Sequence, residues 1–516
     1  MLKGSPLRVA QAVLVVFPSF FLFGYVQIVV GGLVNFDHWV QTFPEIDTTY
    51  TTGADRSHRS VIEGVYVASF TLGAAVGALS CLFTGDVLGR RRNVFLGGLV
   101  ALIGTAISCS AFQLSQLIVG RVVTGMGVGI LNSIVPIWQS ECSPATNRGK
   151  HVVIDGIFIT CGYAVADWVA YGFSRIDQHP VSWRVPLAIP SAACIILCLS
   201  VFLFPESPRW LVRIGKAKQA AQGLARIKNI EAGSEDIQKE IAAIQSSLEE
   251  TAQNTASFKD IFTMKDGKLF YRLMLCIGIQ FWIQMTGANV ISTYSTTIFQ
   301  DNLDLSASVS RILAACAMTW KCLASFVAFF TIDRFGRRKL FLFSGTGVTL
   351  CMMAMAISSR FAGPENRGAS IASAFFLFLF NFFFPIGFLG PTFLYCTEIA
   401  PLRLRVTMTS LGIANNWLWN FMVQMVTPVA LTNIGWKYYL VYMFVTATFP
   451  VTVYFFYPET MGQSLEQLED LFQRDWPIWK IVRAASQSSK GSLEEGLDEG
   501  SEAKTKIVND EKEVVA

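Results

Sequence analysis

Amide side chains inside long apolar segments are the residues of this chain best suited to hold a polar molecule. Gln280 and Gln284 lie one helical turn apart in one such segment, and Asn289 follows near its end. Asn416 and Asn420 lie one turn apart in another segment. Each amide offers hydrogen-bond donors and an acceptor, although a single amide could equally well join two membrane helices. As a group, these amides favour a polar cavity.

Two cations also lie inside apolar segments. Lys321 stands in the middle of "AMTWKCLASF", and Arg121 lies in an earlier segment. A charge in the centre of a membrane costs about 2.5–3.5 kcal/mol, so Lys321 should face water or a partner. Asp167 is the only acid well inside a segment and could pair with Lys321, although it should lie several turns nearer the outside. One interpretation is an electropositive cavity for a carboxylate; the other is a lysine that pairs or extends its amine to the interface.

The elements that must position these side chains are apolar segments long enough to cross a membrane. The 516 residues are 52% hydrophobic and only 15% charged. About 20 mostly apolar residues span the ~30 Å hydrocarbon core of a bilayer. Twelve segments qualify, at 13–33, 62–84, 94–113, 117–138, 152–172, 186–204, 270–291, 308–331, 340–359, 369–396, 407–431 and 436–457. The predicted fold is an all-α membrane protein with twelve transmembrane helices.

Lysine and arginine gather in alternate loops, after the second, fourth, eighth and tenth segments. Short positively charged loops stay in the cytoplasm, so both termini should be cytoplasmic. The net charge of +4 follows from this bias and does not indicate nucleic acid. The eleven cysteines have no paired spacing, and the chain has no His–Glu metal pair, nucleophile elbow or phosphate loop. We therefore expect no enzyme activity, no cofactor and no metal.

Three motifs occur twice, in the same order and at nearly one offset. "GDVLGRRR" (Gly85–Arg92) returns as "IDRFGRRK" (Ile332–Lys339). "ECSPATNR" (Glu141–Arg148) returns as "EIAPLRLR" (Glu398–Arg405), and "PESPRW" (Pro205–Trp210) as "PETMGQ" (Pro458–Gln463). Such a repeat predicts two six-helix halves. We assign 1–204 and 270–457 to the halves, 205–269 to a cytoplasmic linker with short helices, and 458–516 to a largely disordered cytoplasmic tail.

The repeated motifs place acids and arginines at matched helix ends, where they can form charge-assisted pairs between helices. We expect these pairs to form a cytoplasmic gate that latches the two halves together and breaks when that side opens. The alternative is a set of surface ion pairs worth about 0–1 kcal/mol each. The gate residues are Asp86, Arg90, Arg91, Glu141, Arg148, Asp333, Arg337, Arg338, Glu398 and Arg405.

These motifs, with "GRVVTGMGVG" (Gly120–Gly129) and "GANVISTY" (Gly287–Tyr294), resemble the sugar porter family of the major facilitator superfamily. The likeness extends to about residue 472 and is greatest to fungal hexose, pentose and lactose porters. It implies alternating-access transport of a sugar or related small molecule through the lipid bilayer. It also implies a monomer, with the plasma membrane as the default location.

The resemblance further implies which side chains contact the solute. The matching positions are Gln280, Gln284, Asn289, Asn416, Trp417 and Asn420, with Phe393 in place of a frequent tryptophan. Lys321 stands where relatives often carry an asparagine that faces the sugar, and Arg121 is the fourth-helix arginine. Two departures alter the cavity, because Gly156 and Ile283 stand where glutamines are major sugar ligands in relatives.

Val26 is the departure from the family motif that bears on whether transport is coupled to protons. In proton-coupled relatives the first-helix motif reads Gly-Tyr-Asp, and its acid faces the fourth-helix arginine. Here Gly24, Tyr25 and Arg121 are present, but valine replaces the acid. Since valine cannot bind a proton, the resemblance favours facilitative uniport. Asp167 or Glu63 could titrate instead, although neither occupies a known coupling position.

Other functions fit the same pattern. The lysine favours an acid sugar or another organic acid as the solute. A uniporter follows the gradient, so export of a pathway product is as compatible as uptake. The replaced ligands also fit a nutrient sensor that binds a solute without transporting it, although the tail of some sixty residues is short for a sensor.

Overall fold

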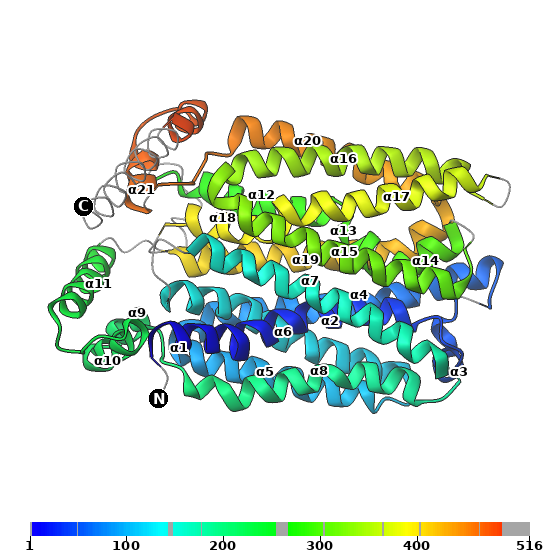
Figure 1. Ribbon diagram of the computed structural model, residues 1–516, viewed down its shortest axis with the longest axis horizontal. Coiled ribbons are helices and arrows are strands. Elements are labelled where there is room, and N and C mark those ends of the chain that lie inside the picture. Colours follow the sequence, from blue (N-terminus) through cyan, green and yellow to red (C-terminus); the bar gives the residue numbers. More distant parts are fainter. Residues whose placement is uncertain are drawn as a thin grey trace, which may run out of the picture.

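The computed structural model describes residues 3–48, 50–142, 148–176, 178–253, 267–302, 305–363, 366–401, 404–463 and 465–487, and throughout these ranges the regular elements are helices. Long helices run side by side in two groups, which we call the N-terminal and C-terminal halves (Figure 1). Eleven helical stretches are long and apolar enough to cross a membrane. The 30-residue α19 (Arg405–Ile434) is not among these stretches, but it is as long as they are and packs against α4 (Gly53–Leu88).

The N-terminal half contains the first six long helices. The first is α1 (Gly4–Gln11), which continues through a π-helical turn (Ala12–Val16) into α2 (Phe17–Leu33). The others are α4 (Gly53–Leu88), α5 (Arg90–Cys109), α6 (Leu114–Cys142), α7 (Arg148–Phe173) and α8 (Val181–Ser200). The short α3 (Asp37–Thr42) covers one end of the bundle.

The C-terminal half repeats this plan with two interrupted helices. Its elements are α12 (Leu269–Met285), α13 (Ala288–Thr293), α14 (Ser295–Thr297), α15 (Ala307–Phe335), α16 (Arg337–Phe361), α17 (Arg367–Phe384), α18 (Pro391–Ile399), α19 and α20 (Lys437–Phe456). The helix break between α12 and α13 lies at Gly287, whose φ of 77° suits glycine. The break matters because it separates Gln284 on α12 from Asn289 on α13.

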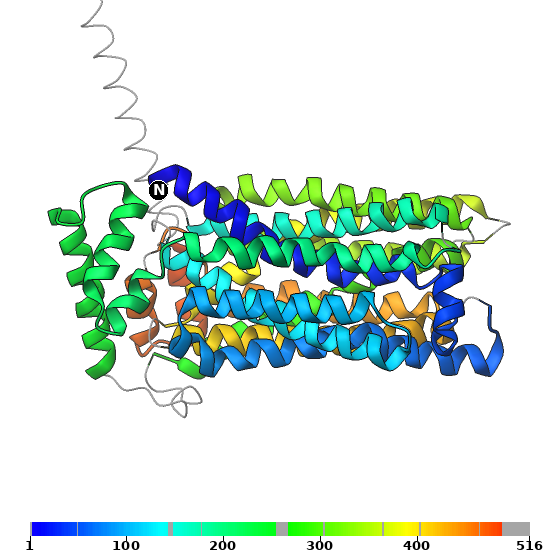
Figure 2. The ribbon, with the colours of Figure 1, turned by 90° about the horizontal axis from the view of Figure 1, so that it is seen from below.

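Short helices gather at one end of the bundle. They are α9 (Pro208–Arg213), α10 (Ala217–Lys228) and α11 (Glu235–Gln253), which follow the N-terminal half, and α21 (Leu465–Gln473), which follows α20. Figures 1 and 2 show them at the end where α1 begins. We call this the network end, after the ion pairs found there, and the opposite end, near α3, the far end. Within the expected linker and tail, residues 254–266 and 488–516 lie outside the described residues.

The turns of the first repeated motif have the same backbone geometry in both halves. Gly89 joins α4 to α5 with φ of 81°, and Gly336 joins α15 to α16 with φ of 84°. The two halves touch through α4 against α19, α7 against α15, and α2 against α13. Whatever lies on these faces is therefore buried between the halves.

Candidate functional site

A cavity lies between the two halves, about midway along the helices. The space inside it that the centre of a water-sized sphere can reach is about 20 Å³, which is room for about one water molecule, so the cavity must widen before a larger solute can enter. Its lining combines amides, aromatic rings and one amine: Phe23, Gln27, Tyr163, Ile283, Gln284, Ala288, Asn289, Lys321, Phe384, Leu389, Phe393, Asn416 and Asn420. Six of the nine predicted solute contacts are in this lining.

The amides form one continuous hydrogen-bonded chain along the cavity wall. Gln284 Nε2 donates to Asn416 Oδ1 at 2.7 Å, and Asn289 Nδ2 donates both to Asn420 Oδ1 at 3.0 Å and to the Gln284 side-chain oxygen. Gln27 Nε2 of α2 donates to Asn289 Oδ1 at 2.8 Å and so connects the two halves. The hydroxyl groups of a solute could replace these amide–amide bonds one at a time, since a hydroxyl also donates and accepts hydrogen bonds.

Lys321 on α15 is the one charged group in the cavity lining. Its side chain is almost fully buried, with 1% exposed. Its Nζ donates to Ser292 Oγ at 2.7 Å and lies 5.0 Å and 4.7 Å from the ring centroids of Tyr163 and Phe384. No ion pair with Asp167 forms among the described residues, so the pairing considered from the sequence is wrong for this conformation. A hydroxyl and two rings leave the positive charge without a formal counter-charge.

Three predicted contacts lie outside the cavity lining. Gln280 faces α18, where its Nε2 donates to Cys396 Sγ at 3.4 Å. Trp417 packs edge-on against Phe23 and Phe70, with ring centroids 4.9 Å and 5.8 Å away. The third is Arg121, which joins helices of the N-terminal half.

Arg121 is held by backbone oxygens, one of them at position 26, where the resemblance to proton-coupled sugar porters implies an acid. Its Nη1 donates to the Val26 carbonyl of α2 at 3.0 Å, and its Nη2 donates to the Val67 carbonyl of α4 at 3.2 Å. Its guanidinium also lies 5.5 Å and 5.2 Å from the ring centroids of Tyr66 and Phe70. Arg121 therefore contacts position 26 through the backbone carbonyl of Val26 and not through a side chain.

The two departures from the sugar porter pattern have different structural consequences. Ile283 lines the cavity and makes that part of its wall apolar. Gly156 instead stands against the opposite half, where an added Cβ would lie 3.3 Å from Gly390 N. A Cβ on Gly390 would in turn lie 2.9 Å from Val153 Cα. These backbone contacts close the cavity towards the network end.

The cavity is also closed towards the far end. A Cβ on Gly31 of α2 would lie 1.8 Å from the Thr293 carbonyl oxygen of α13. A Cβ on Gly64 of α4 would lie 2.4 Å from the Met425 carbonyl oxygen of α19. The two halves therefore meet on both sides of the cavity.

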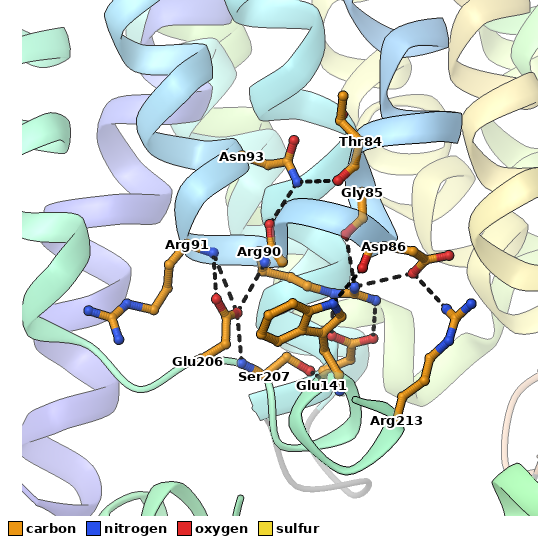
Figure 3. A network of polar contacts seen from close by, with 12 residues as sticks. Thr84, Gly85, Asp86, Arg90, Arg91, Asn93, Glu141, Glu206, Ser207 and Arg213 are labelled. Carbon is orange, nitrogen blue, oxygen red and sulfur yellow. Dashed lines mark hydrogen bonds and ion pairs between the residues drawn. The ribbon is translucent and has the colours of Figure 1, made fainter. Parts of the chain in front are cut away.

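An ion-pair network occupies the network end of the N-terminal half (Figure 3). Nε and Nη2 of Arg90 each donate to one oxygen of Glu141 at 3.0 Å, and its Nη1 lies 3.4 Å from Asp86 Oδ1. Arg213 of α9 lies 2.7 Å from the same Asp86 oxygen. Charge-assisted forks of this kind are stronger than single neutral hydrogen bonds.

The C-terminal half repeats this network. Nε and Nη2 of Arg337 donate to the two oxygens of Glu398 at 3.2 Å and 2.8 Å, and its Nη1 lies 3.5 Å from Asp333 Oδ1. Arg338 donates to Ser486 Oγ at 2.9 Å. The ion pairs of Arg90, Arg213 and Arg337 each join elements of one half or its adjoining linker, rather than the two halves directly.

Two gate residues are placed less completely. Arg405 is the first residue of α19 and stands at the network end. The side chain of Arg148 lies outside the described residues, so the expected Glu141–Arg148 pair stays a prediction.

Each network includes an acid that the sequence interpretation did not select. Glu206 accepts the backbone N–H of Arg90 and of Arg91, both at 3.1 Å. Glu459 accepts the backbone N–H of Arg337 and of Arg338, both at 3.0 Å. Carboxylates suit these positions because each caps the N-terminus of a long helix. The repeated Pro-Glu of the third motif was the signal that could have identified them.

The sequence interpretation also missed several cavity residues. Gln27 could have been found, because it is an amide inside an apolar segment like the others. Tyr163 and Phe384 gave no such signal, because aromatic residues occur throughout the apolar segments. Ser292 is recognisable only through its bond to Lys321.

Comparison with known proteins reveals extensive similarity. A model of the family described as "Sugar (and other) transporter" matches residues 11–472. The major facilitator superfamily transporter mfsA of Aspergillus fumigatus is 32% identical over 97% of this chain and 93% of its own length. Sugar transporter STL1 of Saccharomyces cerevisiae is 32% identical over 93% of this chain and 84% of its own length. The major facilitator proton:xylose symporter XylE, solved with 6-bromo-6-deoxy-D-glucose, superimposes with a TM-score of 0.77 at 21% identity, over 91% of this chain and all of its own.

Proposed function

The chain belongs to the sugar (and other) transporter family and has the major facilitator fold, and from that premise we propose that it carries a sugar-like solute across a membrane by alternating access. The family match confirms the resemblance that the motifs indicated, and with it the expectation of a transporter rather than an enzyme. The plasma membrane, cytoplasmic termini and a monomer remain part of the proposal.

The observation that carries the proposal is the chain of amides in the closed cavity. Gln284, Asn289, Asn416 and Asn420 are buried between the halves, and each takes part in an amide–amide bond. Buried polar groups need partners, so a polyhydroxylated solute that replaces these bonds fits better than an apolar one. The aromatic walls from Phe23, Tyr163, Phe384 and Phe393 suit the C–H faces of such a solute.

Alternating access is supported by the two closures of the cavity. The Gly31–Thr293 and Gly156–Gly390 approaches join the same two halves on opposite sides of the cavity. Separating one approach while the other holds would open the cavity to one side only. Transporters built from repeats operate by such rocking around a central site.

We place the carrier among facilitators. The groups that hold the Arg121 guanidinium are backbone carbonyls of Val26 and Val67, which cannot exchange protons at physiological pH. The two terminal nitrogens of Arg121 therefore have acceptors that do not titrate, while its Nε has no partner among the described residues. The proposal therefore includes downhill movement of the solute without a coupled proton.

Uptake of labelled hexoses, pentoses and polyols into cells that lack their own carriers tests this proposal. Saturable uptake that a protonophore leaves unchanged is the expected result. Collapse of uptake with the protonophore would contradict the facilitative part, and Asp167 and Glu63 would be the first acids to replace. Absence of uptake for every solute, with the protein at the cell surface, would favour a sensor.

The lone cavity cation supports a second candidate solute, an acid sugar or other hydroxylated carboxylate. A carboxylate would give the Lys321 ammonium the counter-charge that Ser292, Tyr163 and Phe384 do not supply. Charge-assisted hydrogen bonds are about twice as strong as neutral ones.

Lys321→Asn tests this candidate through the ranking of substrates. We expect uronate uptake to fall by about 10- to 100-fold relative to neutral hexose, because a hydrogen bond to a charged group contributes about 1.5–3 kcal/mol. Lys321→Arg keeps the charge and should preserve the preference for uronate. An unchanged ranking of neutral and acidic solutes in Lys321→Asn would exclude an electropositive solute site.

A further inference from the structure

Asp155 is a buried acid that the solute cavity does not use. It lies in the second turn of α7, and only 4% of the residue is exposed. Among the described residues, no ion pair reaches either carboxyl oxygen, and the hydrogen-bonding side chain beside it is the neutral amide of Gln139 on α6. Asp155 is eight positions nearer the network end than Tyr163, which lines the cavity.

The charged groups on the neighbouring helices are engaged elsewhere. On α15, Lys321 binds Ser292, Asp333 lies beside Arg337, and Arg334 is exposed. On α18, Glu398 binds Arg337. On α6, Arg121 binds carbonyls and Glu141 binds Arg90. These are not the partners of Asp155.

Among the side chains that the structure describes, the other helices around α7 offer no counter-charge either. On α8, Arg184 donates to the carbonyls of Cys109 and Ala111 near the far end. The α2 segment Phe17–Leu33 has no titratable side chain except Tyr25, which donates to the Pro186 carbonyl. On α7 itself, the side chains of Lys150 and His151 lie outside the described residues.

The protonation state that fits this closed arrangement follows from the cost of burying charge. An ionised carboxylate taken out of water without a partner loses several kcal/mol of solvation, and such a group takes up a proton instead. A neutral carboxyl with two weakly partnered oxygens is far less costly to bury. The closed arrangement therefore favours the protonated form of Asp155.

Opening at the network end would change the surroundings of this carboxyl. The flanking residues Val153 and Gly156 are the ones that stand against Gly390 of the other half. When these contacts separate, water reaches the first turns of α7 and hydrates the carboxyl. The ionised form then becomes favourable, so proton binding and closure are thermodynamically linked.

We propose that Asp155 is a proton-binding site that makes opening of the network end depend on the pH of the compartment it faces. Protonated Asp155 favours the conformation in which the network end is closed, and ionised Asp155 favours the conformation in which it is open. Because Asp155 lies on the network side of the cavity, it takes its proton from that compartment and returns it there. No net proton crosses the membrane, which is compatible with facilitated transport. The inference rests on the alternating access of the proposed function.

The test uses the full-length protein in proteoliposomes, with the pH varied on one side at a time. Solute exchange by the wild type should rise with pH on the network side, by up to about tenfold per pH unit because one proton is released on opening. Asp155→Asn cannot ionise, so its exchange should remain slow and independent of pH. Asp155→Glu should retain the pH dependence, and Asp167→Asn, which alters another buried acid of α7, should retain it as well.

A second readout does not require the solute to be known. Amide hydrogen exchange of residues 391–399 in α18 is compared between the wild type and Asp155→Asn at the same pH. Faster exchange in the wild type at alkaline pH, with the difference vanishing in acid, is the expected result. Equal exchange at every pH, or an Asp155→Asn carrier with the pH profile of the wild type, would overturn the inference. Failure to find a transported solute would instead count against the proposed function.

Discussion

Gly31→Ala should reduce transport by about 10- to 100-fold while the protein still reaches the membrane. The added Cβ would lie 1.8 Å from the Thr293 carbonyl oxygen, far inside van der Waals contact. Either α2 or α13 must move, and overpacking of this kind costs about 1–3 kcal/mol. The cost applies only when the far end is closed, so the carrier should accumulate with that end open. Uptake and solute exchange should both be slow, while the purified variant should still bind the solute.

Gly172→Ala provides the matched control for Gly31→Ala. Gly172 also lies near the far end of a long N-terminal helix, but a Cβ there meets no atom within 4 Å. This variant should transport at the wild-type rate. If Gly31→Ala transports as fast as Gly172→Ala at equal membrane levels, the close approach of α2 to α13 is not needed for the transport cycle.

Gln284→Ala should raise the KM for the solute by about 10- to 100-fold. The substitution removes the donor to Asn416 and the acceptor for Asn289. Each unsatisfied buried polar group costs about 1–3 kcal/mol. The solute also loses a side chain that can both donate and accept a hydrogen bond. Initial rates of uptake over a range of solute concentrations measure this effect.

Gln280→Ala distinguishes the loss of a solute contact in the cavity from a general disruption of α12. Gln280 is one turn away from Gln284 on the same helix and is equally buried, but it binds Cys396 outside the cavity. We expect its replacement to change the KM much less than Gln284→Ala does. Equal effects of the two substitutions would mean that the amides act by holding helices together and not by binding the solute.

Much of this protein could be predicted from its sequence because a membrane imposes simple rules on a chain. Apolar segments of about 20 residues must be helices, since every backbone polar group needs a partner within the bilayer. The three repeated motifs predicted two similar halves, and Gly89 and Gly336 adopt matching backbone conformations within the first of them. The arginines of that motif also meet acids of the second motif in both halves.

Residue type alone could not determine which amides face the solute cavity. Gln280 and Gln284 have the same chemistry and are both almost fully buried on one helix, yet only Gln284 lines the cavity. The direction of each side chain depends on the rotation of α12 against α18 and α19. Gln27 acquires its role only because α2 lies against α13, a neighbour more than 250 positions away.

The electrostatics of the interior were likewise decided by the tertiary structure. The sequence identified Lys321 and Arg121 as buried cations and Val26 as the missing acid. Only the packed helices place carbonyl oxygens around Arg121 and a serine with two rings around Lys321. Composition and periodicity determine which segments cross the membrane, because burial there depends on length and apolarity. The partner of each buried polar group depends on contacts between distant segments, and those exist only once the two halves are packed together.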